Sequence, residues 1–177
     1  RPFAFSAFDA EKLTASLIIR KRGRGTEILA AKQKNDSLDV IGPLGCPFPM
    51  PGTKQKALLV AGGIGLGPVL FLASLLKEAE FVFGCRTGSL VPSSGFFKGL
   101  KPIICTDDGS RGFKGTAGDY LKSIEHRVTK GTVLYACGPM PMLKECHGFA
   151  AKFGIECFVS VEQVMACGVG ACMGCAV

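Results

Sequence analysis

The sequence predicts a small β-barrel, then an α/β unit with a parallel sheet and, at the end of the chain, a cysteine-rich loop. Residues 1–52 hold short apolar runs separated by tight turns, which is typical of antiparallel strands. Residues 53–160 alternate strand-like and helix-like patterns, which is typical of a parallel sheet. Residues 161–177 contain closely spaced cysteines. The boundary between the first two parts falls in a proline- and glycine-rich loop over residues 42–52.

Strands and one short helix are predicted in the first part. Residues 1–8 and 13–20 are apolar runs on either side of a polar turn, which predicts a hairpin, and residues 36–41 are predicted as a further strand. Thr26 is placed to cap a helix over residues 27–34. Because the start of a helix presents free N–H groups and the positive end of its dipole, a pyrophosphate site is one interpretation of this segment.

A glycine-rich turn opens the second part. Residues 57–61 are predicted as a buried parallel strand, and a helix follows the turn. Gly63 and Gly65 match the first two glycines of a dinucleotide-binding turn, whereas Pro68 stands where the third glycine is expected. The pattern favours either close approach of the backbone to a phosphate or a tight turn without a ligand. The charge-free run 57–76 is long enough to span a membrane, but its glycines and proline divide it into strand, turn and helix, so no membrane contact is expected.

Further strands of the α/β unit are predicted at residues 80–84, 101–106, 131–136 and 155–160. Asp107 and Asp108 follow one of these strands and are predicted either to bond ribose hydroxyls or to cap a turn. Arg86 stands near the place where an acidic residue would read a ribose 2′-hydroxyl, and it would favour a 2′-phosphate instead. These residues alone therefore do not select between NAD and NADP.

Composition excludes several other classes. The chain has 47% hydrophobic and 20% charged residues, which is ordinary for a globular protein. Its net charge of +7 is scattered except at residues 20–24, and it has no tryptophan and two tyrosines, so nucleic-acid binding is not expected. Nine cysteines without a signal peptide favour reduced thiols and the cytoplasm. His126 and His147 are isolated, and no catalytic triad is evident, so bound cofactors are expected to carry the chemistry.

The last stretch carries the most specific pattern. Cys167, Cys172 and Cys175 have the C-x4-C-x2-C spacing that begins a plant-type 2Fe–2S site. The glycines between them permit a tight loop with N–H groups directed at the sulfurs, while a zinc site or a group of structural thiols are the alternatives. Such a cluster needs a fourth ligand, which is expected beyond Val177 in a chain cut at both ends. Otherwise it is one of Cys46, Cys85, Cys105, Cys137, Cys146 and Cys157.

Four motifs in order, GGIGLGP, TDDGS, YACGPMPML and MACGVGACMGC, resemble the electron-transfer subunits of type B dihydroorotate dehydrogenase, in the ferredoxin-NADP reductase superfamily. The resemblance covers nearly the whole chain. It implies a ferredoxin-reductase-like fold in which residues 1–52 are part of an FAD-binding barrel and residues 53–160 are an NAD-binding domain. Residues 161–177 would then begin the cluster-binding segment.

The resemblance also implies ligands residue by residue. The family's Arg-Pro-x-Ser flavin strand corresponds to Arg1-Pro2-Phe3-Ala4, so Ala4 replaces a serine near flavin N5, and Phe3 is placed to pack on the flavin ring. The implied FAD-binding residues are Arg1, Pro2, Phe3, Ala4, Ile18, Ile19, Arg20, Gly25 and Thr26. The implied NAD-binding residues are Gly62, Gly63, Gly65, Gly67, Pro68, Cys137, Gly138 and Pro139. The implied cluster ligands are Cys167, Cys172 and Cys175.

The function implied by the resemblance is electron transfer in pyrimidine (UMP) biosynthesis. Dihydroorotate would be oxidised on a partner catalytic subunit that carries FMN, in a heterotetramer, and the electrons would pass through the 2Fe–2S cluster and FAD to NAD+. A related flavin and iron–sulfur subunit of sulfide or hydrogen metabolism is the nearest alternative. A non-catalytic metal-binding module, in which the glycine loops are only turns, is an alternative from another class.

Overall fold

The computed structural model describes residues 2–97, 99–163 and 165–174. Its centre is a six-stranded parallel sheet with the order β6-β5-β4-β3-β7-β8. The strands are β3 (Lys56–Gly62), β4 (Ala79–Cys85), β5 (Ile103–Thr106), β6 (Phe113–Lys114), β7 (Thr132–Cys137) and β8 (Glu156–Ser160). The direction of winding switches between β3 and β7. Ligands of open α/β sheets bind outside the carboxyl ends of the strands at such a switch.

The central strands form because their side chains are apolar on both faces. Leu59, Val60 and Ala61 of β3 are fully buried, and every residue of β7 is buried. Continuous apolar runs of this kind are typical of parallel strands that are covered on both sides. The predicted parallel strands are confirmed with their ends shifted by one or two residues, whereas the short strand β6 was not predicted.

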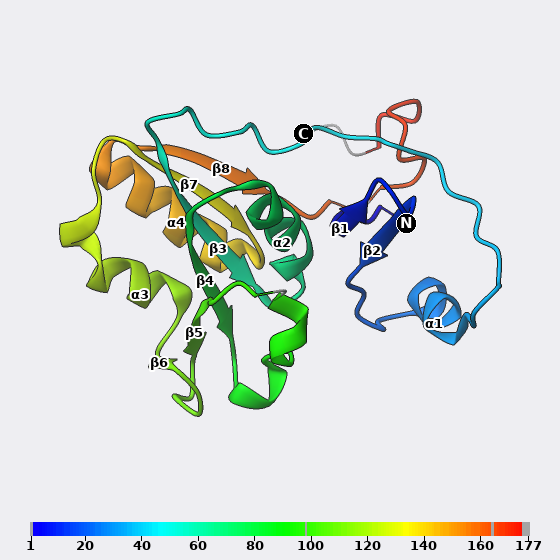
Figure 1. The fold of residues 1–177 in the computed structure, drawn as a ribbon, viewed down its shortest axis with the longest axis horizontal. Helices are drawn as coiled ribbons and strands as arrows, with labels where there is room; N and C mark the ends of the chain where they lie inside the picture. Colours follow the sequence, from blue (N-terminus) through cyan, green and yellow to red (C-terminus); the bar gives the residue numbers. More distant parts are fainter. Residues whose placement is uncertain (1, 98, 164, 175–177) are drawn as a thin grey trace.

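Helices cover both faces of the sheet, as Figure 1 shows. The helix α2 (Leu66–Leu75) lies on one face, and α3 (Ala117–Ser123) and α4 (Met140–Phe153) lie on the other. Thr116 caps α3, because its hydroxyl accepts a hydrogen bond from the Asp119 N–H while the Asp119 carboxylate accepts one from the Thr116 N–H. Short 3-10 segments complete the unit: η1 (Gly63–Gly65), η2 (Gly88–Leu90), η3 (Ser94–Phe97) and η4 (Glu125–Arg127).

The first part of the chain forms an antiparallel hairpin of β1 (Phe5–Asp9) and β2 (Thr14–Leu17), followed by α1 (Arg24–Ala31). The hairpin packs on α2, whereas α1 lies away from the sheet (Figure 1). Ser6 is buried in β1, and its hydroxyl donates a hydrogen bond to the Ser16 carbonyl at 3.0 Å. The sequence predicts part of a barrel here, and the described residues of this part form one pair of strands.

Two predictions for this part are wrong. Residues 36–41 are exposed and pair with no strand in the described part of the chain, and extended backbone without a partner does not form a sheet. The helix begins earlier than predicted, at Arg24, so Thr26 lies inside its first turn. The Thr26 hydroxyl accepts hydrogen bonds from the N–H groups of Arg22 and Gly23, and it thereby ties the preceding loop to the helix.

The charge-free run 57–76 supplies β3, the glycine turn and α2, as predicted. Within the residues that the structure describes, no helix combines the length and the apolar character needed to cross a bilayer.

A tyrosine lies in the core beside the sheet. Tyr135 of β7 is fully buried, its ring stacks on Phe158 with centroids 5.5 Å apart, and Phe48 meets it edge-on at 5.6 Å. Burial, with a smaller effect of the nearby Glu156 charge, raises the pKa of Tyr135, so the hydroxyl is neutral. Among the described residues this hydroxyl has no hydrogen-bond partner. An unpaired buried hydroxyl destabilises the folded state.

We predict that Tyr135→Phe stabilises the protein by about 1 kcal/mol, because it removes the unpaired hydroxyl and keeps both ring contacts. Tyr120→Phe is the matched control, since the Tyr120 hydroxyl donates to Glu80 at 3.2 Å and its loss should destabilise by about 1 kcal/mol. Urea unfolding of both variants measures the two changes. Destabilisation by Tyr135→Phe would contradict the account and would indicate an ordered water at that hydroxyl.

Candidate functional site

The carboxyl ends of β3 and β7 meet in one close backbone contact. Ala61 and Cys137 are partners in the sheet register, and the chain turns after each strand. A Cβ on Gly65 would lie 2.8 Å from the Gly138 nitrogen and would overlap the Cys137 carbonyl. Only glycine therefore allows the two turns to approach this closely. Five of the predicted nucleotide-binding residues converge here: Gly62, Gly65, Cys137, Gly138 and Pro139.

Met142, which the sequence analysis did not single out, lies over the same two strand ends. A Cβ on Gly62 would lie 2.7 Å from the Met142 Sδ, and a Cβ on Gly138 would lie 2.6 Å from the Met142 Cε. Met142 is in the first turn of α4 and packs against the core on that face of the sheet. Gly62 and Gly138 are thus required by packing inside the protein. The only sequence signal for Met142 is its place in the motif YACGPMPML.

Predicted flavin-side residues reach the other side of the glycine turn. The Arg20 Nη2 lies 3.5 Å from the position that a Cβ on Gly63 would take, and Gly63 has a φ of 52°. The position that a Cβ on Gly67 would take lies 3.9 Å from the Ile18 Cβ and 4.0 Å from the Ala4 carbonyl oxygen. The structure therefore brings the two ends of the hairpin against η1 and the start of α2.

Other predicted residues lie outside this contact. Pro2 and Phe3 precede β1, with Phe3 39% exposed, and Ile19 is half-buried after β2. Gly25 and Thr26 lie in α1, away from the sheet (Figure 1). Pro68 is in the first turn of α2. Pro139, the N-cap of α4, belongs to the contact, because its Cδ lies 2.8 Å from the position that a Cβ on Gly62 would take. Arg1 lies outside the described residues.

The Cys137 thiol stands at the end of β7 and is buried. Burial raises the pKa of Cys137, and a hydrogen bond with Ser160 of β8 offsets part of this effect. The thiol is therefore protonated at neutral pH, so it contributes no charge at the switch between β3 and β7.

The cysteine loop turns tightly about one sulfur. The Cys172 N–H donates a hydrogen bond to the Cys167 Sγ at 3.5 Å. Gly168 and Gly170 have φ values of 72° and 78°, a left-handed conformation that favours glycine. One backbone N–H of the loop is therefore directed at the Cys167 sulfur, and the role of the glycines at a cluster stays a prediction.

These N–H groups change the acidity of the thiol. Backbone hydrogen bonds, first from Cys172 and then from Val169, lower the pKa of Cys167 to about 6. The thiolate, which is the form that binds a metal, is therefore favoured at neutral pH. Cys167 thus fits the chemistry of an iron–sulfur site.

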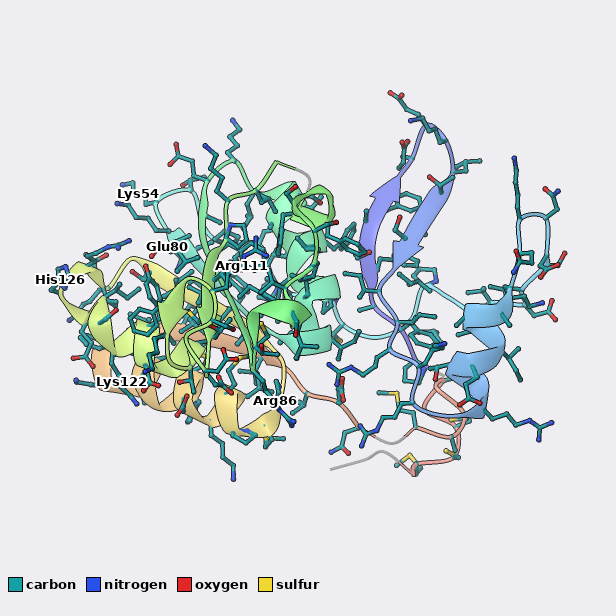
Figure 2. All side chains as sticks on the ribbon, turned by 90° about the horizontal axis from the view of Figure 1, so that it is seen from below. Lys54, Glu80, Arg86, Arg111, Lys122 and His126 are labelled. Atoms are coloured by element: carbon teal, nitrogen blue, oxygen red, sulfur yellow. The ribbon has the colours of Figure 1, made fainter. Side chains whose placement is uncertain are left out.

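The third predicted ligand, Cys175, lies outside the described residues. In the ranges that the structure describes, no group of three or more His, Cys, Asp or Glu side chains is placed to hold a metal ion. Figures 1 and 2 both show the cysteine loop on the hairpin side of the molecule, away from α3.

Curated proteins named dihydroorotate dehydrogenase B (NAD(+)), electron transfer subunit, are similar to this chain over nearly its full length. The protein of Caldanaerobacter subterraneus subsp. tengcongensis is 35% identical over 99% of this chain and 69% of its own length. That of Desulforamulus reducens is 37% identical over 100% of this chain and 70% of its own length. That of Geobacillus sp. strain WCH70 is 40% identical over 99% of this chain and 69% of its own length. No protein-family model matches the chain.

Solved structures share the fold. The NADH-dependent reduced ferredoxin-NADP oxidoreductase, studied for flavin-based electron bifurcation, superposes with a TM-score of 0.82 at 30% identity. The match covers 99% of this chain and 65% of that one. The ferredoxin reductase of carbazole 1,9a-dioxygenase superposes with a TM-score of 0.72 over 89% of this chain and 54% of that one, and at 18% identity it supports the fold alone.

The sheet order and these superpositions define a protein with the ferredoxin reductase fold. The named relatives make it a component of an oxidoreductase. The chain belongs to the family of electron-transfer subunits of the NAD-linked dihydroorotate dehydrogenase B. The resemblance drawn from the motifs is confirmed.

We predict that Gly65→Ala destabilises the protein by about 3 kcal/mol, because the added methyl group forces the β3 and β7 turns apart. Gly148→Ala is the matched control: a Cβ there would meet no atom within 4 Å, and the residue lies inside α4. The control should stabilise by about 0.5–1 kcal/mol, the ordinary gain of alanine over glycine in a helix. Urea unfolding measures both, and equal stability of the two variants would show that the turns can separate freely.

Proposed function

We propose that this chain passes electrons between a 2Fe–2S cluster, FAD and NAD+ for a partner subunit that oxidises dihydroorotate. One observation carries the proposal. The segments proposed to bind flavin meet the segment proposed to bind nicotinamide around the start of α2. Arg20 lies near Gly63, while Ile18 and the Ala4 carbonyl lie near Gly67. Hydride transfer needs the two rings held in contact, and one helix start that touches both binding segments suits this requirement.

The segments near the hairpin suit a flavin dinucleotide. Gly25 and Thr26 lie in the first turn of α1, where free N–H groups favour a phosphate, and Arg20 adds a positive charge beside η1. Phe3 is partly exposed and available to pack on a ring. Ala4 offers no hydroxyl to the flavin, so its backbone is the only polar group that it contributes.

The turn after β3 suits a dinucleotide phosphate. Apart from Gly63 and its two chain neighbours, the Arg20 guanidinium is the only group of the described residues within 4 Å of the position that a Cβ on Gly63 would take. The backbone is therefore open to close approach by an anion, and Arg20 would balance its charge. Gly62, Gly65 and Gly138 shape this turn through packing, while Pro68 and Pro139 begin the helices that follow.

The cysteine loop suits a cluster. Cys167, Cys172 and Cys175 are the proposed ligands, and the backbone N–H groups that stabilise the Cys167 thiolate would also hold a bound sulfur. When bound, FAD exchanges a hydride with nicotinamide and single electrons with an iron–sulfur centre, which is the chemistry that links a two-electron and a one-electron carrier. The protein contributes binding and orientation.

The proposed partner is an FMN-containing dihydroorotate dehydrogenase catalytic subunit, assembled with this chain as a heterotetramer in the cytoplasm for pyrimidine biosynthesis. The names of the relatives as electron transfer subunits support a separate catalytic subunit. Residues 1–52 are proposed as part of the flavin domain, residues 53–160 as the nucleotide domain and residues 161–177 as the start of the cluster segment.

A second candidate is a related NAD(P)H oxidoreductase subunit, as in sulfide or hydrogen metabolism. This candidate is supported by the superposition on the NADH-dependent reduced ferredoxin-NADP oxidoreductase, which has a TM-score of 0.82. The two functions differ in the electron donor. Reduction of NAD+ by dihydroorotate in the assembled complex supports the first, whereas reduction by ferredoxin without any response to dihydroorotate supports the second.

We predict that Cys172→Ser abolishes the broad red absorbance of the cluster and leaves the flavin bands in place, because the cluster loses a ligand while the hairpin is untouched. Cys46→Ser is the matched control: it alters an exposed cysteine in a different loop and should leave both sets of bands unchanged, whereas loss of the cluster bands in this variant would identify Cys46 as the fourth ligand. Visible spectra of the anaerobically purified full-length complex measure this. A colourless wild-type protein that binds zinc would overturn the proposed function in favour of a metal-binding module.

A further inference from the structure

The first part of the chain is joined to the parallel sheet by a long strap, residues 32–55, which lies between α1 and β3. Figure 1 shows the strap in light blue and cyan, running from the hairpin side of the molecule to the start of β3. Residues 32–47 are exposed, whereas Phe48, Pro51 and Gln55 are half-buried. The side chains near the end of the strap therefore decide how firmly it lies on the sheet.

Phe48 attaches the strap to the face of the sheet that α2 covers. Its ring meets Tyr135 of β7 edge-on, with centroids 5.6 Å apart, and Tyr135 stacks on Phe158 of β8 at 5.5 Å. Ile18, which directly follows β2, packs against the same hydrophobic core. The first part of the chain thus touches this core at two places, through Ile18 and through Phe48.

Gln55 ties the end of the strap to the edge strand β8. Its Nε2 donates a hydrogen bond to the Glu156 Oε2 at 2.6 Å, while its Oε1 accepts one from the Gly52 N–H at 2.6 Å. The Gln55 N–H also donates to the Gly52 carbonyl at 2.9 Å. One side chain therefore closes the last turn of the strap and joins that turn to β8. Hydrogen bonds to a charged carboxylate are stronger than those between neutral groups.

We propose that Phe48 and Gln55 are positioning residues, which hold the first part of the chain at a fixed angle to the parallel sheet. This inference rests on the proposed function, because it concerns the alignment of the segments proposed to bind flavin and nicotinamide. The packing of the hairpin on α2 is one attachment, and a body held at one place can still rotate about it. The strap adds a second attachment at β7 and β8, which removes that rotation. Since hydride transfer needs aligned rings, the angle set by the strap affects its rate.

An exchange of the Gln55 and Glu156 side chains tests the hydrogen bond. Gln55→Glu places two carboxylates side by side and should release the strap, so backbone hydrogen exchange over residues 46–56 should become about fivefold faster. The double variant Gln55→Glu/Glu156→Gln again pairs a donor with an acceptor, and its exchange should return to the wild-type rate.

Stopped-flow spectra of the full-length complex test the effect on alignment. The rate at which NADH bleaches the flavin bands should fall about tenfold in Gln55→Glu and recover in the double variant. Phe48→Ala should slow the bleaching by a similar factor. Phe153→Ala is the matched control, because Phe153 is also half-buried and contacts a neighbouring ring, that of Phe149 at 5.0 Å, but packs on the other face of the sheet. Both phenylalanine variants should unfold at lower urea concentration, whereas the control should keep the wild-type rate of bleaching.

The outcomes separate the inference from the proposed function. Unchanged hydrogen exchange in Gln55→Glu, a double variant as slow as Gln55→Glu, or equal slowing in Phe48→Ala and Phe153→Ala overturns the positioning role and leaves the proposed function standing. A wild-type complex whose flavin bands NADH does not bleach overturns the proposed function and this inference with it.

Discussion

The structure depends on the backbone contact between the turn at Gly65 and the turn at Cys137 and Gly138. Since a side chain at Gly65 would overlap the opposite carbonyl, the carboxyl ends of β3 and β7 can meet only with glycine there. This contact sets the position of η1, and η1 sets the start of α2. Because the hairpin packs on α2, the contact also decides where the residues proposed to bind flavin lie relative to those proposed to bind nicotinamide.

The parallel sheet could be predicted because the patterns that mark its strands lie within short stretches of the sequence. Buried strands such as β3 and β7 are continuous apolar runs, and glycine and proline mark their ends in the sequence. The strand predicted at residues 36–41 is wrong for the opposite reason. A half-apolar edge strand exists only if a partner strand satisfies its backbone, and pairing is a property of distant residues.

The sequence indicates what kind of site the glycine turn forms, but not the contacts that shape this turn. The glycines of the turn indicated phosphate binding or a tight turn, and the structure shows that Gly62 and Gly138 serve the packing of Met142 from α4. The sequence cannot reveal the contact with Gly62, since Met142 is far along the chain from that residue. The capping role of Asp108 was equally hidden: its carboxylate accepts hydrogen bonds from the Ser110 N–H and hydroxyl, and the Ser110 oxygen accepts one from the Gly88 N–H of the neighbouring loop. The ligands proposed for the cysteine loop follow from spacing alone, because that spacing is local in the sequence.

The central claim is that one chain connects a two-electron carrier to a one-electron carrier. Anaerobic titration of the full-length complex with NADH, followed in the visible spectrum, tests it most directly. The account predicts that the flavin bands and the broad absorbance of the cluster both bleach, because NADH reduces the flavin and the flavin reduces the cluster. Bleaching of the flavin with an oxidised cluster at the end of the titration would contradict the relay.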